Sequence, residues 1–454
     1  MLQAPTLVIG AECSGVGKTT TTLALLATLR SCGFKVACAK VGPDFIDATY
    51  LAKLSGLPCA NLDLWLDGVS GVQNLWQRLK DLKPDIILIE GVMGLFDGGP
   101  SSTAAVASLF KAQVLLLLDA HGLSDSILAK ALGYLSLGEK YSLNFAGILL
   151  THVGSSLHAH LLHKALATLS VPLLGCLPKS SAPKLQFGTL GLASFEINAD
   201  ELSSNRLVPW FKANCQVDAL LNRLNLQPKE HHKQEKDTSF FGVNHKCAKK
   251  TLAIAFDAAF YLCYADIPSY LSELGLEIVY FSPLNDQKIP ECAGIYLPGG
   301  FPELYAKELS QNWQMRAALM ALKEKGILIY AEGGGYSYLF TTLELGDGSK
   351  WPMADLLHGC VRKSPKRQAL GYRELTLATP FVENIDTPLR GHEFHYYSLE
   401  AEYQPLWHVY DKDGQSQGQR GSVSQNIAGS FVHLTCQGGQ KFWQGLANLM
   451  HGRM

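Results

Sequence analysis

The sequence predicts an α/β fold with two domains, each built around a largely parallel β-sheet. Three observations support this prediction: the length of the chain, a repeated alternation of strands and helices, and a polar segment near the middle. The chain has 454 residues, more than a single hydrophobic core usually holds, so two domains of roughly 200 residues each are expected. Alternating apolar strands and helices are typical of a parallel sheet covered by helices.

The first half of the chain shows this alternation clearly. Apolar strands are predicted over residues 6–10, 36–39, 86–90, 114–119 and 145–151. A helix is predicted to begin at Lys18, directly after the first strand and its loop. The first domain is therefore predicted to span residues 1–226.

A change of character follows this domain. Residues 227–249 are mostly polar and lack an apolar period, which predicts a linker. Strand-like runs resume at residues 252–256, 276–281, 294–297 and 327–330. A second α/β domain is therefore predicted over residues 250–454.

The composition argues for small-molecule partners. The chain has 39 basic and 40 acidic residues, a balance that gives no electrostatic signal for nucleic acid or an anionic membrane. The longest apolar runs, such as residues 114–118, are too short to span a bilayer. The first residues lack the features of a secretory signal, and the 11 cysteines form no Cys-x-x-Cys pair. We therefore expect a cytoplasmic protein with reduced thiols.

A phosphate-binding loop is predicted at residues 14–20, Ser-Gly-Val-Gly-Lys-Thr-Thr. A loop between a strand and a helix presents backbone N–H groups to phosphate oxygens, while a lysine neutralises their charge and a threonine hydroxyl ligates magnesium. The residues predicted to bind the nucleotide are Ser14, Gly15, Gly17, Lys18, Thr19 and Thr20. The match to the usual pattern is incomplete, because Glu12 stands where that pattern has glycine. The alternative is an ordinary Gly-Lys-Thr turn.

Two further segments predict the rest of a magnesium–nucleotide site. Lys40 and Asp44 lie at the end of a predicted strand, and Glu90 ends another. Because open α/β sheets bind ligands at the carboxyl ends of their strands, Asp44 and Glu90 could converge with Thr19 on one cation. Lys40 would be an anion partner. The alternative for each carboxylate is a solvated position in a turn.

Longer motifs carry a resemblance to a known family. In the first half they are Lys-Val-Gly-Pro-Asp-Phe-Ile-Asp at 40–47, Asn-Leu-Asp at 61–63, Glu-Gly-Val-Met-Gly-Leu-Phe-Asp-Gly at 90–98 and Ser-Thr-Ala-Ala at 102–105. In the second half they are Phe-Ser-Pro-Leu-Asn-Asp at 281–286, Pro-Gly-Gly-Phe-Pro-Glu at 298–303, Gly-Tyr-Arg-Glu at 371–374 and Gly-His-Glu-Phe-His-Tyr at 391–396. Together they resemble the cobyrinate a,c-diamide synthase family. The resemblance implies a P-loop synthetase domain of the dethiobiotin synthetase type, followed by a class I glutamine amidotransferase domain.

The resemblance also implies a reaction. Enzymes of this family activate carboxylates of a corrin by phosphoryl transfer from ATP, and ammonia then displaces phosphate to leave a carboxamide. By this resemblance Lys18 and Lys40 would serve the phosphates, and Mg²⁺ would be held by Thr19, Asp44 and Glu90. Asp47 and Asp97 would line the acceptor site, the alternative being structural positions in turns.

Two segments depart from the family pattern. Thr151-His152-Val153 stands where the family often has Asn-Arg-Val, which would alter base selectivity if that asparagine contacts adenine. Gly188-Thr189-Leu190-Gly191-Leu192 replaces an Arg-His-Leu-Gly-Leu segment and loses two side chains suited to a polyanion. Another tetrapyrrole, such as a metallated sirohydrochlorin, is therefore an alternative acceptor.

The second domain lacks its expected nucleophile. Gly333 stands in Ala-Glu-Gly-Gly-Gly, where the family has the cysteine that attacks glutamine. The resemblance assigns His433 as the catalytic histidine and Gly299 and Gly300 as the oxyanion turn. Thr435 occupies a position where many class I enzymes place a glutamate that orients the histidine.

No other residue is expected to replace the missing thiol. Cys263, Cys292 and Cys360 do not lie in a strand–turn–helix context, and Ser337 is one turn beyond the elbow. We therefore expect an inactive glutaminase half and a supply of free ammonia or of ammonia from a separate glutaminase. His392 and His395 could form a metal pair, but a structural or substrate-facing role is favoured.

A different class of function stays open. A non-catalytic protein could bind nucleotide in the first domain and a corrinoid in the second. The intact set of Lys18, Thr19, Asp44 and Glu90 favours the ligase. The sequence leaves a homodimer open as the assembly state.

Overall fold

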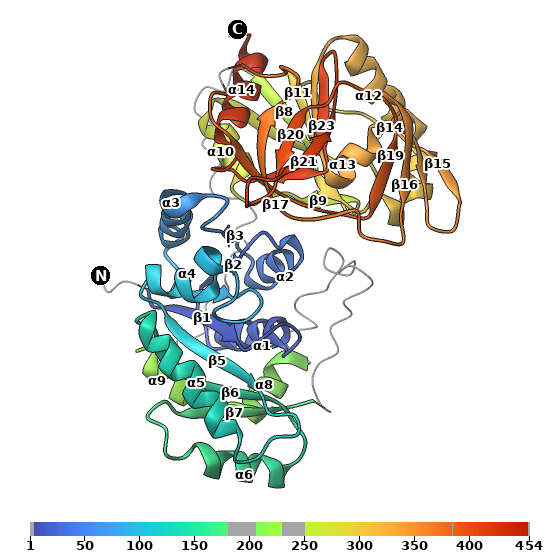
Figure 1. Ribbon diagram of the computed structural model, residues 1–454. Helices are drawn as coiled ribbons and strands as arrows, with labels where there is room; N and C mark the ends of the chain where they lie inside the picture. The colour runs from blue at the N-terminus through green and yellow to red at the C-terminus, as the bar shows by residue number, and fades with distance from the viewer. Residues whose placement is uncertain (1–3, 180–205, 229–249, 384, 453–454) are drawn as a thin grey trace. The chain divides into compact units, whose positions relative to one another are not determined.

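The computed structural model describes residues 4–179, 206–228, 250–383 and 385–452 (Figure 1). The chain divides into two compact units, Met1–Trp65 with Val69–Ser239 and Leu66–Gly68 with Phe240–Met454. In the described part of the chain, no helix is long and apolar enough to cross a membrane.

The first unit is built on a seven-stranded sheet with the order β3-β2-β4-β1-β5-β6-β7, in which all neighbours are parallel. Its strands are β1 Thr6–Ala11, β2 Val36–Val41, β3 Cys59–Leu62, β4 Ile86–Glu90, β5 Gln113–Asp119, β6 Asn144–Val153 and β7 Leu173–Pro178. Strands β1, β2 and β4 are buried along their whole length. A parallel sheet covered on both faces needs such continuous apolar runs, which is why these strands could be predicted from sequence.

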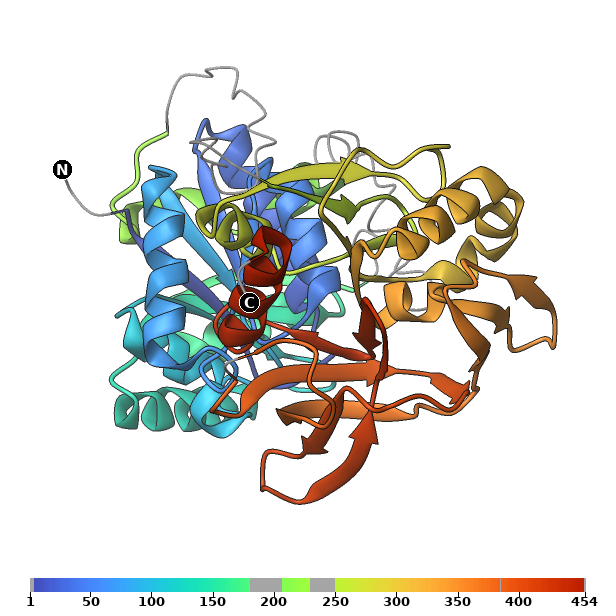
Figure 2. The ribbon, with the colours of Figure 1, turned by 90° about the horizontal axis from the view of Figure 1, so that it is seen from above.

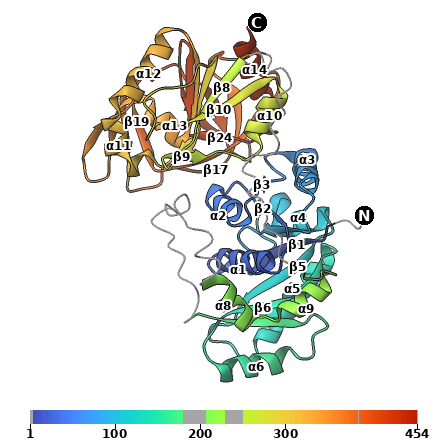
Figure 3. The ribbon, with the colours of Figure 1, turned by 180° about the vertical axis from the view of Figure 1, so that it is seen from behind.

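Helices cover this sheet. They are α1 Lys18–Ser31, α2 Phe45–Ser55, α3 Gly68–Asp81, α4 Thr103–Leu109, α5 Ile127–Lys140, α6 Ser156–Leu166, α8 Val208–Asn214 and α9 Val217–Arg223, with a short 3-10 turn η1 at Gly99–Ser101. On one face, Leu7 and Ile9 of β1 share a core with Leu25 of α1 and Phe211 of α8. Helices α1 and α8 lie side by side there (Figure 3). The carboxyl ends of β1, β2 and β4 therefore meet at one edge of a rigid sheet.

The second unit also contains a mainly parallel sheet, with the order β10-β8-β11-β13-β23-β22. Its strands are β8 Lys250–Ala255, β10 Leu276–Phe281, β11 Gly294–Leu297, β13 Leu328–Glu332, β22 Ser422–Ser424 and β23 Ile427–Ser430. Only the edge strand β22 is antiparallel to its neighbour. This is the α/β unit that the sequence predicts for the second half.

Helices pack on both faces of this second sheet. They are α10 Ile267–Glu273, η4 Pro302–Leu304, α11 Ala306–Gln311, α12 Trp313–Glu324, α13 Gly333–Tyr338 and α14 Gln440–His451. Side chains alternate along β13, so that Ile329 shares a core with Leu319 of α12, whereas Tyr330 packs against Phe442 of α14. Helices α12 and α14 accordingly lie at opposite sides of the unit (Figure 2).

Further strands complete the second unit. A four-stranded sheet, β15-β14-β16-β19, and a five-stranded sheet, β21-β20-β17-β18-β24, pack beside the central one, and β9 pairs with β12. The bounds are β9 Phe260–Leu262, β12 Gly299–Gly300, β14 Phe340–Glu344, β15 Lys350–Pro352, β16 Leu357–Lys363, β17 Ala369–Leu377, β18 Leu389–His395, β19 Tyr397–Glu400, β20 Trp407–Tyr410, β21 Ser416–Arg420 and β24 Val432–Leu434. The sequence did not predict these sheets, because many of their strands are short and partly exposed.

Two predicted features lie wholly or largely outside the described residues. One is the altered segment at residues 188–192, and the other is the linker at residues 227–249.

Candidate functional sites

The phosphate-loop segment joins β1 to α1. Gly15 has φ of 84° and Gly17 has φ of 89°, both in the left-handed region. A Cβ atom on either residue would have open space around it, so backbone conformation and not crowding favours glycine there. Ser14 and Gly15 are exposed, and Thr20 is half-buried in the first turn of the helix. The loop thus leads directly into the N-terminus of a 14-residue helix, a geometry suited to an anion.

Lys18 is buried beside this loop. Its Nζ donates to the Cys13 carbonyl oxygen at 3.2 Å and to the Met93 carbonyl oxygen at 2.5 Å. Burial, followed by the charge of Lys40, lowers the pKa of Lys18. The two carbonyls hold the ammonium against the loop without neutralising its charge, so it is available to an anionic ligand.

A polar cluster lies at the carboxyl ends of β2 and β4, beside the first turn of α1. Thr19 Oγ1 donates to Glu90 Oε1 at 2.7 Å and to Asp47 Oδ1 at 3.3 Å. Lys40 Nζ contacts Asp47 Oδ2 at 2.9 Å and Glu90 Oε1 at 3.2 Å, and donates to the Gly91 carbonyl at 2.9 Å. The fold therefore brings Thr19, Lys40, Asp47 and Glu90 together, from four separate segments.

Charges in this cluster alter each other's ionisation. Burial lowers the pKa of Lys40, but the carboxylates of Glu90 and Asp47 outweigh that effect and raise it overall. Burial raises the pKa of Glu90, while Lys40 and Thr19 oppose the rise. Lys40 consequently stays charged, and a further cation near Glu90 would favour its ionised form.

The cluster fits a magnesium ion. Glu90 Oε2 is fully buried and has no hydrogen-bond partner among the residues described, and the Thr19 hydroxyl lies on the other oxygen of the same carboxylate. In the described part of the chain, no group of three His, Cys, Asp or Glu side chains has the arrangement of a metal cage. Mg²⁺ usually takes only one or two carboxylates and completes its shell with phosphate and water oxygens, so the donor set is suitable.

Asp44 lies next to this cluster in a different role. It is the N-cap of α2, where its Oδ1 accepts from the backbone N–H groups of Ile46 and Asp47 at 2.8 and 3.1 Å. Asn61 supports the same turn, because its Nδ2 donates to the carbonyl oxygens of Gly42 and Asp44 at 2.8 and 3.0 Å. The contacts thus place Asp47, and not Asp44, against Thr19. The motif at residues 61–63 was the only sequence signal for Asn61.

The loop after β4 places Asp97 at the protein surface. Asp97 Oδ2 accepts from the Gly94 N–H at 2.9 Å and closes the loop. A Cβ on Gly94 would lie 2.6 Å from the Glu12 carbonyl oxygen, so this loop packs closely on the phosphate loop. Asp97 is exposed and is not part of the buried cluster.

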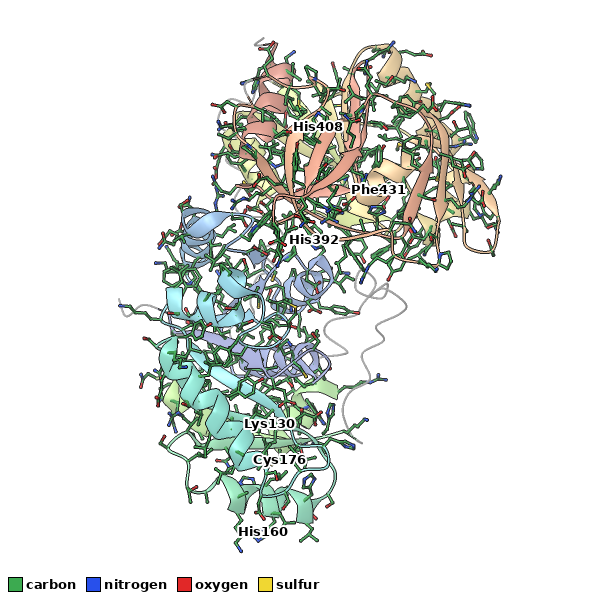
Figure 4. All side chains as sticks on the ribbon, in the orientation of Figure 1. Lys130, His160, Cys176, His392, His408 and Phe431 are labelled. Atoms are coloured by element: carbon green, nitrogen blue, oxygen red, sulfur yellow. The ribbon has the colours of Figure 1, made fainter. Side chains whose placement is uncertain are left out.

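Glu12, which departs from the usual phosphate-loop pattern, is held by helix α5. Its carboxylate pairs with Lys130 at 2.9 Å, and its carbonyl accepts from Tyr134 Oη at 2.9 Å. Figure 4 labels Lys130 in the first unit. Glu12 therefore links the phosphate loop to α5.

The Thr151 segment ends β6. Thr151 is buried, and its Oγ1 has no hydrogen-bond partner in the described structure. His152 has φ of 55° and pairs through Nδ1 with Asp119 Oδ2 at 3.0 Å. Thr151 and His152 thus lie at the same sheet edge as the end of β5.

A second candidate site lies in the other unit, at the turn from β13 into α13. Gly333 has φ of 51°, and a Cβ built on it would lie 2.6 Å from Cε1 and 2.7 Å from Nε2 of His433. A Cβ on Gly299 would lie 2.4 Å from the same Cε1, and one on Gly300 would lie 1.8 Å from the Ala259 carbonyl oxygen. The histidine ring therefore fills space that glycine at residue 333 leaves open.

The two halves match separate domain families. Residues 7–186 match the CobQ/CobB/MinD/ParA nucleotide binding domain, and residues 251–441 match the CobB/CobQ-like glutamine amidotransferase domain. A cobyrinate a,c-diamide synthase of Leptospira interrogans is 35% identical, covering 99% of this chain and 98% of its own. One of Syntrophotalea carbinolica is 36% identical over 95% of each chain. A hydrogenobyrinate a,c-diamide synthase of Brucella anthropi is 35% identical over 95% of this chain and 99% of its own.

The chain belongs to the cobyrinate a,c-diamide synthase family. The turn from β13 into α13 lies within the residues that match the glutamine amidotransferase domain. His433, Gly299 and Gly300 lie around this turn, and residue 333 is a glycine without a side chain.

The three cysteines considered in the sequence, Cys263, Cys292 and Cys360, have raised thiol pKa values, which disfavour the reactive thiolate. Burial, together with the charge of Glu332, raises the pKa of Cys263 well above its usual value. Burial also raises the pKa of Cys292 and of Cys360. Ser337 Oγ donates to the Gly333 carbonyl at 3.4 Å, within α13.

Thr435 closes a turn, and the other two histidines, His392 and His395, lie on strand β18. Thr435 Oγ1 accepts from the Gly438 N–H at 2.9 Å, which closes the turn into α14. His392 and His395 lie on strand β18, where an odd spacing directs side chains to opposite faces, so they do not form the helical metal pair considered above. His395 instead bonds Glu393 Oε1 through Nε2 at 3.0 Å and stacks on Phe431 with ring centroids 4.2 Å apart.

Proposed function

We propose that this protein catalyses the ATP-dependent amidation of the a and c side-chain carboxylates of cobyrinate in cobalamin biosynthesis, through acyl phosphates. We further propose that it uses free ammonia or ammonia from a separate glutaminase. One observation carries the first proposal: Thr19, Lys40, Asp47 and Glu90 converge beside a phosphate loop in a buried cluster. Membership of the family supports the choice of reaction.

In the first step, an acceptor carboxylate oxygen attacks the γ-phosphorus of ATP. The bond to the bridging oxygen breaks, and ADP leaves with the electron pair. Lys18 would neutralise the phosphate oxygens, and Lys40 would keep Asp47 and Glu90 in place. A magnesium ion held by Thr19 and Glu90 would supply further charge neutralisation when bound, with Asp44 as the remaining proposed ligand.

In the second step, ammonia attacks the acyl carbon. The bond to the phosphate oxygen breaks, inorganic phosphate leaves, and the nitrogen loses one proton to give the carboxamide. The absence of a nucleophile at residue 333 supports an external source of ammonia, since glutamine hydrolysis in such domains needs a covalent intermediate.

Turnover with different nitrogen sources tests both proposals. Cobyrinic acid or hydrogenobyrinic acid is incubated with ATP, Mg²⁺ and either glutamine or ammonium, and the diamide is followed by mass spectrometry. Diamide with ammonium alone would support both proposals, and diamide with glutamine alone would contradict the second.

If no diamide forms in this assay, two further measurements separate the alternative functions. A metallated sirohydrochlorin is then offered as the acceptor in the same assay. If it too is not amidated, while nucleotide and corrinoid still bind, the protein is a binding protein and not a ligase.

A further inference from the structure

Glu332 is the last residue of β13, and its carboxylate lies beside β24, the strand that carries His433. Glu332 is 1% exposed. Its Oε2 lies 3.5 Å from His433 Nδ1, and its Oε1 accepts from the backbone N–H of Leu434 at 3.2 Å. One carboxylate therefore contacts both the side chain of His433 and the backbone that follows it.

Two buried tyrosines also donate hydrogen bonds to this carboxylate. Tyr296 Oη donates to Oε2 and Tyr330 Oη donates to Oε1, each at 2.9 Å. The two rings are register partners on β11 and β13 and stack at 5.8 Å. Burial and the charge of Glu332 raise the pKa of both tyrosines well above the usual value, so both phenols remain donors at neutral pH.

The two ring nitrogens of His433 face different residues. Nδ1 faces Glu332, whereas Nε2 lies 2.7 Å from the place of a Cβ on Gly333. A general base needs this orientation, with one ring nitrogen facing an acceptor, here 3.5 Å from it, and the other directed at the nucleophile. Thr435 Oγ1 accepts from the Gly438 N–H in the turn before α14.

We infer that Glu332 is the positioning residue of His433: it selects the imidazole tautomer with the proton on Nδ1 and directs the Nε2 lone pair toward residue 333. The residue that orients the histidine would thus directly precede the nucleophile position in the chain, instead of following the histidine. The inference concerns the amidotransferase-like unit alone and does not depend on the acceptor or the nitrogen source.

The tautomer can be observed directly. The full chain is prepared with ¹⁵N-labelled histidine, and ring nitrogen shifts are recorded at a pH where His433 is neutral, with Glu332→Gln, Glu332→Asp and, as a control, Glu303→Gln. His433→Gln identifies the signals. Glu303 is a suitable control because it is also a buried carboxylate, paired with Lys363 at 3.0 Å and bonded by Tyr397.

The expected result is a protonated Nδ1 and an unprotonated Nε2 in the unmodified chain and in Glu303→Gln. In Glu332→Gln the population with the proton on Nδ1 should fall, and Glu332→Asp should retain more of it. An unmodified chain with the proton on Nε2 would overturn the inference, even if every Glu332 variant failed to fold. An unchanged tautomer in a folded Glu332→Gln would overturn it as well.

Discussion

The imidazole of His433 lies where a side chain on Gly333 would begin. The distance from a Cβ at residue 333 to His433 Nε2 would be only 2.7 Å, well inside van der Waals contact. Any side chain introduced at this elbow must therefore displace the ring, and this relationship determines the first prediction.

Gly333→Cys should restore some glutamine-dependent amidation. The Cβ forces His433 to shift, and the left-handed φ of 51° adds strain, so the variant should lose about 1–3 kcal/mol of stability. Glutaminase activity is measured as glutamate release, with unfolding followed in parallel. Gly333→Ala is the matched control, since it has the same Cβ and strain but no thiol.

Equal glutamate release by the cysteine and alanine variants would refute this prediction. No release from a folded cysteine variant would mean that the oxyanion turn at Gly299 and Gly300, or the positioning of the histidine, has also been lost.

Lys18→Ala should abolish amide formation with either nitrogen source. Removing one charged donor from a preorganised site typically lowers kcat by about 10²–10³-fold. The measurement is diamide formation with ammonium at saturating ATP. Lys130→Ala is the control, because Lys130 pairs with Glu12 beside the same loop but does not bond the residues of the buried cluster. Amide formation that survives the Lys18 change would contradict the assignment of the phosphate loop.

Glu90→Gln should raise the Mg²⁺ concentration that the reaction requires. The change keeps an oxygen for Thr19 but removes the negative charge next to Lys40. The apparent affinity for Mg²⁺ should fall at least roughly tenfold, by analogy with the loss of partners around other metal sites. Titration of activity with Mg²⁺ checks this. Glu344→Gln is the control, because it removes a carboxylate in the other unit. It should leave the Mg²⁺ titration unchanged.

The second unit should lose stability in acid in two pH ranges. Burial, with the charges of His433 and Arg373, lowers the pKa of His392 from 6.5 to about 3. Burial alone would raise the pKa of Glu393, but His395 and Arg373 outweigh this effect and lower that pKa from 4.5 to about 2. Both pKa values are depressed in the folded state, so both contributions are present above the unfolded pKa and are lost as the pH falls.

The two ranges can be separated by substitution. Within its range, each group should reduce the free energy of unfolding by about 1.4 kcal/mol for each unit by which the pH falls. Denaturant unfolding from pH 7 to 3 should show a smaller pH slope between about 6.5 and 4.5 for His392→Gln, and below about 4.5 for Glu393→Gln. Slopes equal to that of the unmodified chain would show that these groups do not govern the acid response.

Buried parallel strands were the most predictable part of the fold. The run that forms β4, residues Ile86–Glu90, is apolar until its last residue and was predicted with the same bounds. Strands such as β21, residues Ser416–Arg420, are mostly exposed and polar, so no apolar pattern marks them. The fold class could therefore be predicted, but the three additional sheets of the second unit could not.

The candidate sites show a similar division. Thr19 and Glu90 could be predicted to meet because strand ends and a phosphate loop share one edge of a parallel sheet. The contact of Asp47 with Thr19 depends on the capping of α2 by Asp44, which sequence spacing alone does not specify. Glu332 was missed because its partners, Tyr296 and Leu434, are distant in sequence.

The left-handed backbone at Gly333 has an evolutionary consequence. Glycine and cysteine codons can differ by a single base, and the elbow retains the turn, the histidine and the adjoining glycines. A lineage that obtains enough ammonia has no need of the thiol, whereas one that encounters scarce ammonia could regain it by one point mutation. Under the proposed use of free ammonia, residue 333 would set the nitrogen source, and related proteins should differ at this codon according to the ammonium content of their habitats.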